Sequence, residues 1–108
     1  DHRVAFEAAY SCTKNFRYPF IRKILVMEIP SETDFSSGMG GRVFVPNLFV
    51  DIGGFMDEKL AIMSRYPSEV QPSPFPRSLD NIKALALNRG ASAGFEYAES
   101  FMMLKERV

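Results

Sequence analysis

The sequence predicts an α/β fold, and residues 43–66 are the main reason. Residues 43–52 are almost wholly apolar and rich in β-branched and aromatic side chains, which is typical of a strand buried on both faces. The pair Gly53-Gly54 then interrupts the chain. From Met56 onward the apolar residues recur at helical spacing, with charged residues between them. A buried strand followed by an amphipathic helix is the basic unit of an α/β domain.

The first element expected along the chain is a helix over residues 3–14. Val4, Ala8 and Cys12 recur at the spacing of one helical face, which predicts that this face is buried. We therefore expect Cys12 to be an inert thiol in the core. Asp1 would lie at the helix N-terminus, where a carboxylate interacts favourably with the helix dipole.

A strand and a loop are expected next. Residues 24–29 form a short apolar run that ends at Pro30, which predicts a buried strand. Residues 31–42 are polar and rich in glycine, so we expect a mobile loop. A loop of this length is either a functional lid or simply disordered, and the sequence favours neither.

The C-terminal third predicts a second helix and a last strand. Residues 68–76 contain three prolines at alternate positions, which excludes regular structure. Ser78 is a good helix N-cap, and Arg89 followed by Gly90 is a typical helix end. Residues 94–104 fit either a closing strand or a last helix, and we favour the strand.

Length and composition limit the classes of function. A chain of 108 residues has room for one domain. Its 13 basic and 13 acidic residues balance, which argues against nucleic acid and anionic membranes as partners. A single cysteine cannot form an internal disulfide, which fits a reducing compartment such as the cytoplasm. No apolar run approaches the roughly 20 residues of a membrane span. Because a helical pattern begins at once and the first residue is not Met, we expect a piece of a longer protein.

His2 is the only histidine, and it follows a carboxylate, Asp1. A single histidine is most often structural or simply exposed. Beside an acidic residue, however, its imidazole can serve as a metal ligand while the carboxylate orients ligands or handles protons. A catalytic zinc needs about three protein ligands. Any zinc site here must therefore be completed by ligands other than this histidine.

Other polar residues have a structural and a functional interpretation. Arg77, between a proline-rich segment and a helix start, is either a solvated arginine or a guanidinium that binds a polar substrate at a cleft edge. Asn47 and Asp51 lie within the predicted buried strand, where polar groups need hydrogen bonds, so we expect structural roles for them. We expect the same for Tyr97 and Glu99.

Several segments, taken together and in order, resemble the PIG-L/LmbE-like zinc-dependent deacetylases, which act on N-acetylglucosamine-type groups. The matching segments are Asp1-His2-Arg3, Met27-Glu28-Ile29-Pro30-Ser31 with Thr33, Val45-Pro46-Asn47 with Asp51, Ile52, Lys59 and Tyr66, Pro76-Arg77-Ser78, Arg89-Gly90, Gly94, and Tyr97-Ala98-Glu99-Ser100-Phe101. Each motif is weak alone, but their shared order is fairly specific. The resemblance covers nearly the whole chain and only the C-terminal half of the family.

This resemblance implies residues 1–108 as a single domain, the C-terminal fragment of a Rossmann-like, three-layer α/β/α fold with a mostly parallel sheet. It implies His2 as the third zinc ligand, Asp1 as a catalytic partner that orients or moves protons, and Arg77 as a substrate-binding residue. In the family the zinc activates a water that hydrolyses the acetamide of an amino-sugar conjugate. The other two ligands and the general base belong to an Ala-His-Pro-Asp-Asp-Glu motif that this sequence lacks.

The sequence therefore supports two functions. The first is a zinc-dependent N-deacetylase, of which this chain is an incomplete C-terminal part that is inactive on its own and holds zinc weakly or not at all. The alternative is a non-catalytic α/β module that binds a partner through an exposed half-core and forms a homo-oligomer in that way.

Overall fold

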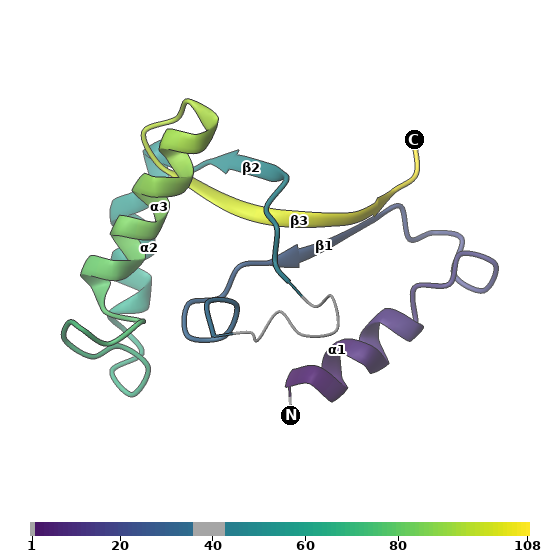
Figure 1. Ribbon diagram of the computed structural model, residues 1–108, viewed down its shortest axis with the longest axis horizontal. Coiled ribbons are helices and arrows are strands. Elements are labelled where there is room, and N and C mark those ends of the chain that lie inside the picture. The colour runs from purple at the N-terminus through teal and green to yellow at the C-terminus, as the bar shows by residue number, and fades with distance from the viewer. Residues whose placement is uncertain (1, 36–42) are drawn as a thin grey trace. The chain divides into compact units, whose positions relative to one another are not determined.

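The computed structural model describes residues 2–35 and 43–108, which form a mixed α/β fold (Figure 1). Its elements in chain order are helix α1 (His2–Ser11), strands β1 (Lys23–Met27) and β2 (Leu48–Asp51), the short 3-10 helix η2 (Gly53–Phe55), helices α2 (Met56–Met63) and α3 (Leu79–Ala93), and strand β3 (Ala98–Glu106). The α/β class and the closing strand are confirmed. Residues 36–42, most of the predicted loop, lie outside the described residues.

The sheet is antiparallel, so the predicted mostly parallel, Rossmann-like arrangement is wrong for the described strands. The strand order is β1-β3-β2, and β2 pairs with β3 in an antiparallel register that sets Leu48 opposite Phe101. At the other edge the Arg107 N–H donates to the carbonyl oxygen of Arg22, so the start of β1 lies beside the end of β3. The physical reason is the turn after α3, which returns the chain antiparallel to β2 instead of through a parallel crossover.

The described residues group into two compact units. The first comprises residues 1–26 and 103–108, and the second comprises residues 27–102. β3 contributes its first residues to the second unit and its last residues to the first.

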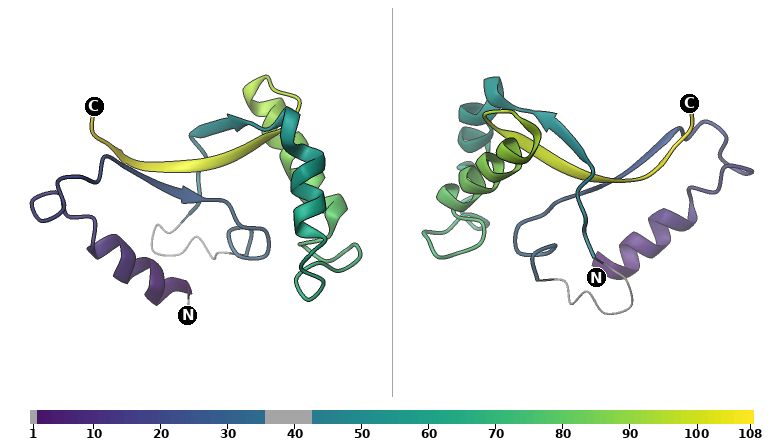
Figure 2. Two further views of the ribbon diagram at one scale, coloured as in Figure 1. Left: turned by 180° about the vertical axis from the view of Figure 1, so that it is seen from behind. Right: turned by 45° about the horizontal axis from the view of Figure 1, so that its top comes forward.

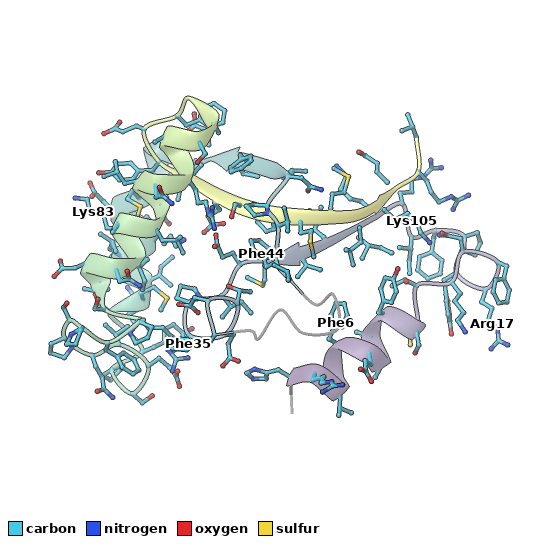
Figure 3. The ribbon with its side chains drawn as sticks, viewed as in Figure 1. Phe6, Arg17, Phe35, Phe44, Lys83 and Lys105 are labelled. Atoms are coloured by element: carbon cyan, nitrogen blue, oxygen red, sulfur yellow. The ribbon has the colours of Figure 1, made fainter. Side chains whose placement is uncertain are left out.

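In the first unit, α1 forms as predicted but buries none of its residues. The rings of Phe6 and Tyr10 stack on one another at 5.8 Å between centroids, and Phe6 projects from the helix in Figure 3. Cys12 is exposed, so the prediction of a core thiol is wrong. The unit is held by polar contacts instead. One of them is a 3.0 Å hydrogen bond from Lys105 Nζ on β3 to the side-chain oxygen of Asn15.

In the second unit, the core lies where α2 and α3 pack together. The two helices run side by side in both views of Figure 2, and they contact one another. The buried cluster is made of Ile52, Met56, Ile82 and Ala86, with Leu60, Met63 and Tyr97 packed against it. The predicted apolar face of α2 is therefore confirmed. Lys83 lies on the outer side of α3 (Figure 3) and is exposed.

The strands are shorter and more exposed than predicted. Of residues 43–52 only Leu48–Asp51 form a strand, β2, and it lies at the edge of the sheet with a single strand partner. β1 alternates between exposed and half-buried residues and has no buried side chain. Both predictions of a fully buried strand are wrong, because apolar composition does not determine which elements cover a strand.

Helix α3 begins as predicted and ends later than predicted. Ser78 is the N-cap, and its hydroxyl accepts a 3.1 Å hydrogen bond from the Asn81 N–H. The helix continues past Gly90 to Ala93, and Gly94 ends it in the left-handed conformation, with φ of 78°. Gly90 has a different purpose. A Cβ there would lie 2.6 Å from the carbonyl oxygen of Phe95, so glycine lets the following backbone pack on the helix.

Candidate functional site

A cavity of about 260 Å³ within the second unit gathers most of its half-buried charged side chains. The segment that follows β1, helices α2 and α3, and the start of β3 all contribute to its lining. The polar lining residues are Glu28, Lys59, Arg77, Arg89, Glu99 and Ser100. Apolar side chains make up the rest, among them Met63, Ile82 and Phe101. The cavity is therefore apolar in bulk with a few convergent charges, which is the usual composition of a ligand site.

The centre of this polar set is the carboxylate of Glu28. Arg89 binds it through two nitrogens, with Nε 2.9 Å from Oε2 and Nη2 bonded to Oε1. The Ser100 hydroxyl donates to Oε2 at 2.6 Å. Only 12% of the Glu28 side chain and 22% of the Arg89 side chain are exposed. This bidentate geometry is the strongest arrangement available to an arginine and a carboxylate. Together with the Ser100 bond it connects the residue that follows β1 with α3 and β3.

The surroundings of Glu28 act on its pKa in opposite directions. Burial raises the pKa, but the hydrogen bonds from Arg89 and Ser100 and the positive charges of Arg89 and Lys59 together hold the pKa below its ordinary value of 4.5. The hydrogen bond between Arg89 and Glu28 in turn raises the pKa of Arg89. Glu28 is therefore a stable carboxylate at neutral pH with its acceptor sites occupied, so it is suited to positioning and not to taking a proton from a substrate.

A second ion pair lies beside the first. Lys59 Nζ on α2 is 2.6 Å from Oε1 of Glu99 on β3. Both side chains are partly exposed, at 32% and 40%. Lys59 is one of the charged residues between the apolar positions of α2, and we expected it on the solvated face. Its side chain instead contacts β3, whereas Asp57 and Glu58 are exposed. The structural role expected for Glu99 is thus supported by a specific partner on another element.

Arg77 lies at the edge of the same cavity, immediately before the α3 N-cap. Its Nη1 is 3.1 Å from Oε2 of Glu69, and its guanidinium lies over the Phe75 ring at 5.6 Å. Its Nε is shielded from solvent and has no hydrogen-bond partner among the described residues. A shielded donor without an acceptor is costly, on the order of 1–3 kcal/mol. Arg77 therefore lies in the cavity wall and is not fully solvated, and its role toward a substrate stays a prediction.

The predicted metal ligand is placed apart from any group of ligands. His2 is the first residue of α1 and is exposed, and Asp1, the predicted catalytic partner, lies outside the described residues. Within residues 2–35 and 43–108, no three His, Cys, Asp or Glu side chains come together as a metal site. Since catalytic zinc needs about three protein ligands, the described residues alone do not fit a zinc ion.

The remaining polar candidates have structural contacts. The Asp51 side chain accepts a 2.9 Å hydrogen bond from the Gly53 N–H and so shapes the turn into η2. The Asn47 N–H donates to the Phe101 carbonyl just before β2 begins. Tyr97 packs on the core, with Lys83 Nζ 6.0 Å from its ring centroid. Structural roles are supported for Asp51 and Tyr97, whereas the Asn47 contact is made by its backbone and leaves the role of its side chain a prediction. Asn47 and Asp51 are exposed and not buried as predicted.

Reasoning from the sequence missed Glu28 and Arg89 as a pair. One signal was available, because Glu28 is a single acidic residue inside an apolar run, where a carboxylate needs a cationic partner. The partner could not be identified, since Arg89 lies 61 residues away and was explained as a helix-ending residue.

Comparison of the chain with protein-family models, curated proteins and solved structures finds no match. A search of the described residues finds no helix with the length and apolar character that crossing a membrane requires.

Proposed function

We propose that this chain is the C-terminal part of a zinc-dependent amide hydrolase that removes acetyl from an N-acetylglucosamine-type sugar conjugate. The observation on which the proposal depends is the convergence of its resembling motifs. Those motifs were identified from sequence order alone, and six polar residues from them line one cavity, namely Glu28, Lys59, Arg77, Arg89, Glu99 and Ser100.

The phenylalanines give a second argument. The sequence has ten, all in the described residues, and none of them is buried. Burying one phenylalanine stabilises a fold by roughly 1.5–3 kcal/mol, so the six rings that are exposed are a large unused source of stability. Phe16 and Phe20 are 80% and 76% exposed. A surface of this kind fits a chain whose core is completed by further polypeptide.

Within this proposal the described residues bind and position a substrate. Arg77 supplies hydrogen-bond donors at the cavity edge. Arg89, Glu28 and Ser100 hold α3, the segment after β1 and β3 together in the same cavity wall. Metal ligands other than His2 have to come from residues outside those described.

The test begins with the coding sequence upstream of Asp1. The proposal expects an Ala-His-Pro-Asp-Asp-like motif there. The longer polypeptide is then assayed for bound zinc and for acetate released from an N-acetylglucosaminyl conjugate. We expect about one zinc per chain and acetate release, and we expect His2→Ala to abolish both. Arg3→Ala is the matched control, since Arg3 is the next residue of α1 and is also exposed.

Three results would overturn the proposal: an upstream sequence without such a motif, unchanged zinc content in His2→Ala, or equal losses in both variants. Stoichiometric, tight zinc on the 108-residue chain itself would also contradict it, because the site would then be complete within these residues.

The exposed apolar side chains favour one second candidate, a non-catalytic module that pairs with a second copy of itself. Val4 and Phe6 on α1 are 63% and 48% exposed. The zero net charge means that two copies do not repel one another. Light scattering after size exclusion tests this candidate, which expects a dimer that Phe6→Ser returns to a monomer. A monomeric wild-type chain contradicts it.

A further inference from the structure

We propose that the cavity of the second unit binds a small monocarboxylic acid with an apolar tail. The inference concerns residues 27–102 alone and does not depend on the deacetylase proposal. It follows from the charges that line the cavity, from the unpartnered nitrogen of Arg77, and from the volume and apolar lining of the space.

The ion pairs around the cavity leave Arg77 as the cationic side chain for a ligand carboxylate. Arg89 and Lys59 are held by the two carboxylates of the cavity wall, whereas Arg77 pairs through Nη1 with Glu69, which lies outside the wall and is 49% exposed. Glu28 is saturated by Arg89 and Ser100, and Glu99 is paired with Lys59. A ligand carboxylate that binds Arg77 at Nε leaves both of these ion pairs intact. Glu28 and Glu99 would repel a dianion such as phosphate more strongly than a monoanion.

Arg77 supplies the donor for that charge. Its Nη1 is engaged by Glu69, whereas its Nε is shielded from water and lacks an acceptor among the described residues. A carboxylate oxygen accepts from Nε–H in the side-on geometry that a guanidinium offers. Binding therefore satisfies a donor that is otherwise left without a partner, and this gain is specific to an acceptor group.

The volume of the cavity limits the size of the ligand, and its apolar lining favours an apolar tail. A cavity of about 260 Å³ corresponds to about nine water molecules at about 30 Å³ each, so it accommodates a ligand of on the order of eight heavy atoms. Met27, Met63 and Leu85 in the wall provide apolar contacts. Hexanoate has this size and charge and serves as the probe.

The experiment is a titration of the 108-residue chain, labelled with ¹³C at its methionine methyl groups and followed by NMR. Met27 and Met63 line the cavity, while Met103 belongs to the first unit and serves as the internal reference. We expect hexanoate to shift the Met27 and Met63 signals in a saturable way and to leave Met103 unchanged. Hexanol, with the same tail and no charge, should bind at least tenfold more weakly, as should inorganic phosphate.

Variants assign the effect to Arg77. Arg77→Gln should weaken hexanoate binding about tenfold, which corresponds to about 1.4 kcal/mol, and should leave hexanol binding unchanged. Arg77→Lys keeps the charge and loses the Nε–H, so the affinity should fall between the two. Arg65→Gln is the matched control, because Arg65 is exposed and lies outside the cavity lining.

Equal affinity for hexanoate and hexanol would overturn the inference, since it would mean a purely apolar cavity. Equal affinity for phosphate would show unspecific anion binding and would overturn it as well. Absence of shifts at Met27 and Met63 would mean that no ligand of this class enters. These three comparisons use the wild-type chain, so they decide the question even if a variant fails to fold.

Discussion

Removing Arg89 is the sharpest test of how the second unit is held together. In Arg89→Met the apolar stem is kept and the guanidinium is lost, so among the described residues the Glu28 carboxylate retains only the Ser100 hydroxyl as a hydrogen-bond partner. Breaking a buried ion pair by removing one partner typically costs about 3–5 kcal/mol. We expect the lower limit, about 3 kcal/mol, because 12% of the Glu28 side chain remains exposed and the charge of Lys59 remains nearby.

The assay is urea unfolding of the 108-residue chain, followed by circular dichroism because the sequence contains no tryptophan. With a slope of about 1.5 kcal/mol per molar urea, a loss of about 3 kcal/mol lowers the midpoint by about 2 M. Arg3→Met is the control, since Arg3 pairs with Glu7 at 3.7 Å on an exposed helix face and such pairs contribute less than about 1 kcal/mol. The double variant Glu28→Gln/Arg89→Met should recover part of the loss, because no unpaired carboxylate is left. If Arg89→Met cost no more than Arg3→Met, the pair would be a surface contact and the reasoning would be refuted.

The same network makes stability depend on pH. The pKa of Glu28 is held below 4.5 in the folded chain by Arg89 and Ser100, despite burial. A carboxylate with a lowered folded pKa contributes stability that is complete above its unfolded pKa and is lost as the pH falls through the folded value. The difference in unfolding free energy between wild type and Glu28→Gln should therefore be constant above about pH 5.5 and should shrink below about pH 4.5. A difference that grows on acidification would contradict this assignment.

Three further substitutions and modifications test local features. Gly90→Ala should cost about 2–3 kcal/mol in unfolding free energy, because its Cβ meets the Phe95 carbonyl at 2.6 Å, whereas Gly54→Ala, with open space around it, should change stability by less than about 0.5 kcal/mol. Ser78→Ala should cost about 1 kcal/mol through loss of the α3 N-cap. Cys12 should react with a thiol reagent in the folded chain at nearly the rate seen in urea, because it is exposed, and strong protection would contradict its placement.

Features decided by neighbours in the sequence were predictable. The apolar face of α2 was identified from the spacing of Met56, Leu60 and Met63, and all three pack in or against the core. The α3 N-cap was identified from Ser78 because a cap depends only on the first turn of its own helix. In both cases the prediction needed only residues within a single helix and its cap.

Features decided by distant contacts were not predictable. Residues 43–52 have the composition of a central strand, yet β3 is central and β2 is an edge. Cys12 has the spacing of a buried face, but no described element covers α1. Gly90 resembled a helix end, whereas its actual role is the close approach of Phe95, which no local pattern announces. The Glu28–Arg89 pair could not be predicted either, because 61 residues separate its two members.

One comparison tests whether further polypeptide covers only the exposed phenylalanines or also fills the cavity. If further polypeptide completes the core, its side chains either cover the six exposed rings and leave the cavity open, or fill the cavity as well. Hexanoate binding to the 108-residue chain and to the longer polypeptide distinguishes these arrangements. Retained affinity means that the carboxylate site belongs to the finished fold, and it leaves Arg77 available to a ligand there. Loss of affinity together with a rise in stability means that the Arg77 Nε finds its acceptor in the added chain, and the cavity is then an interface and not a ligand site.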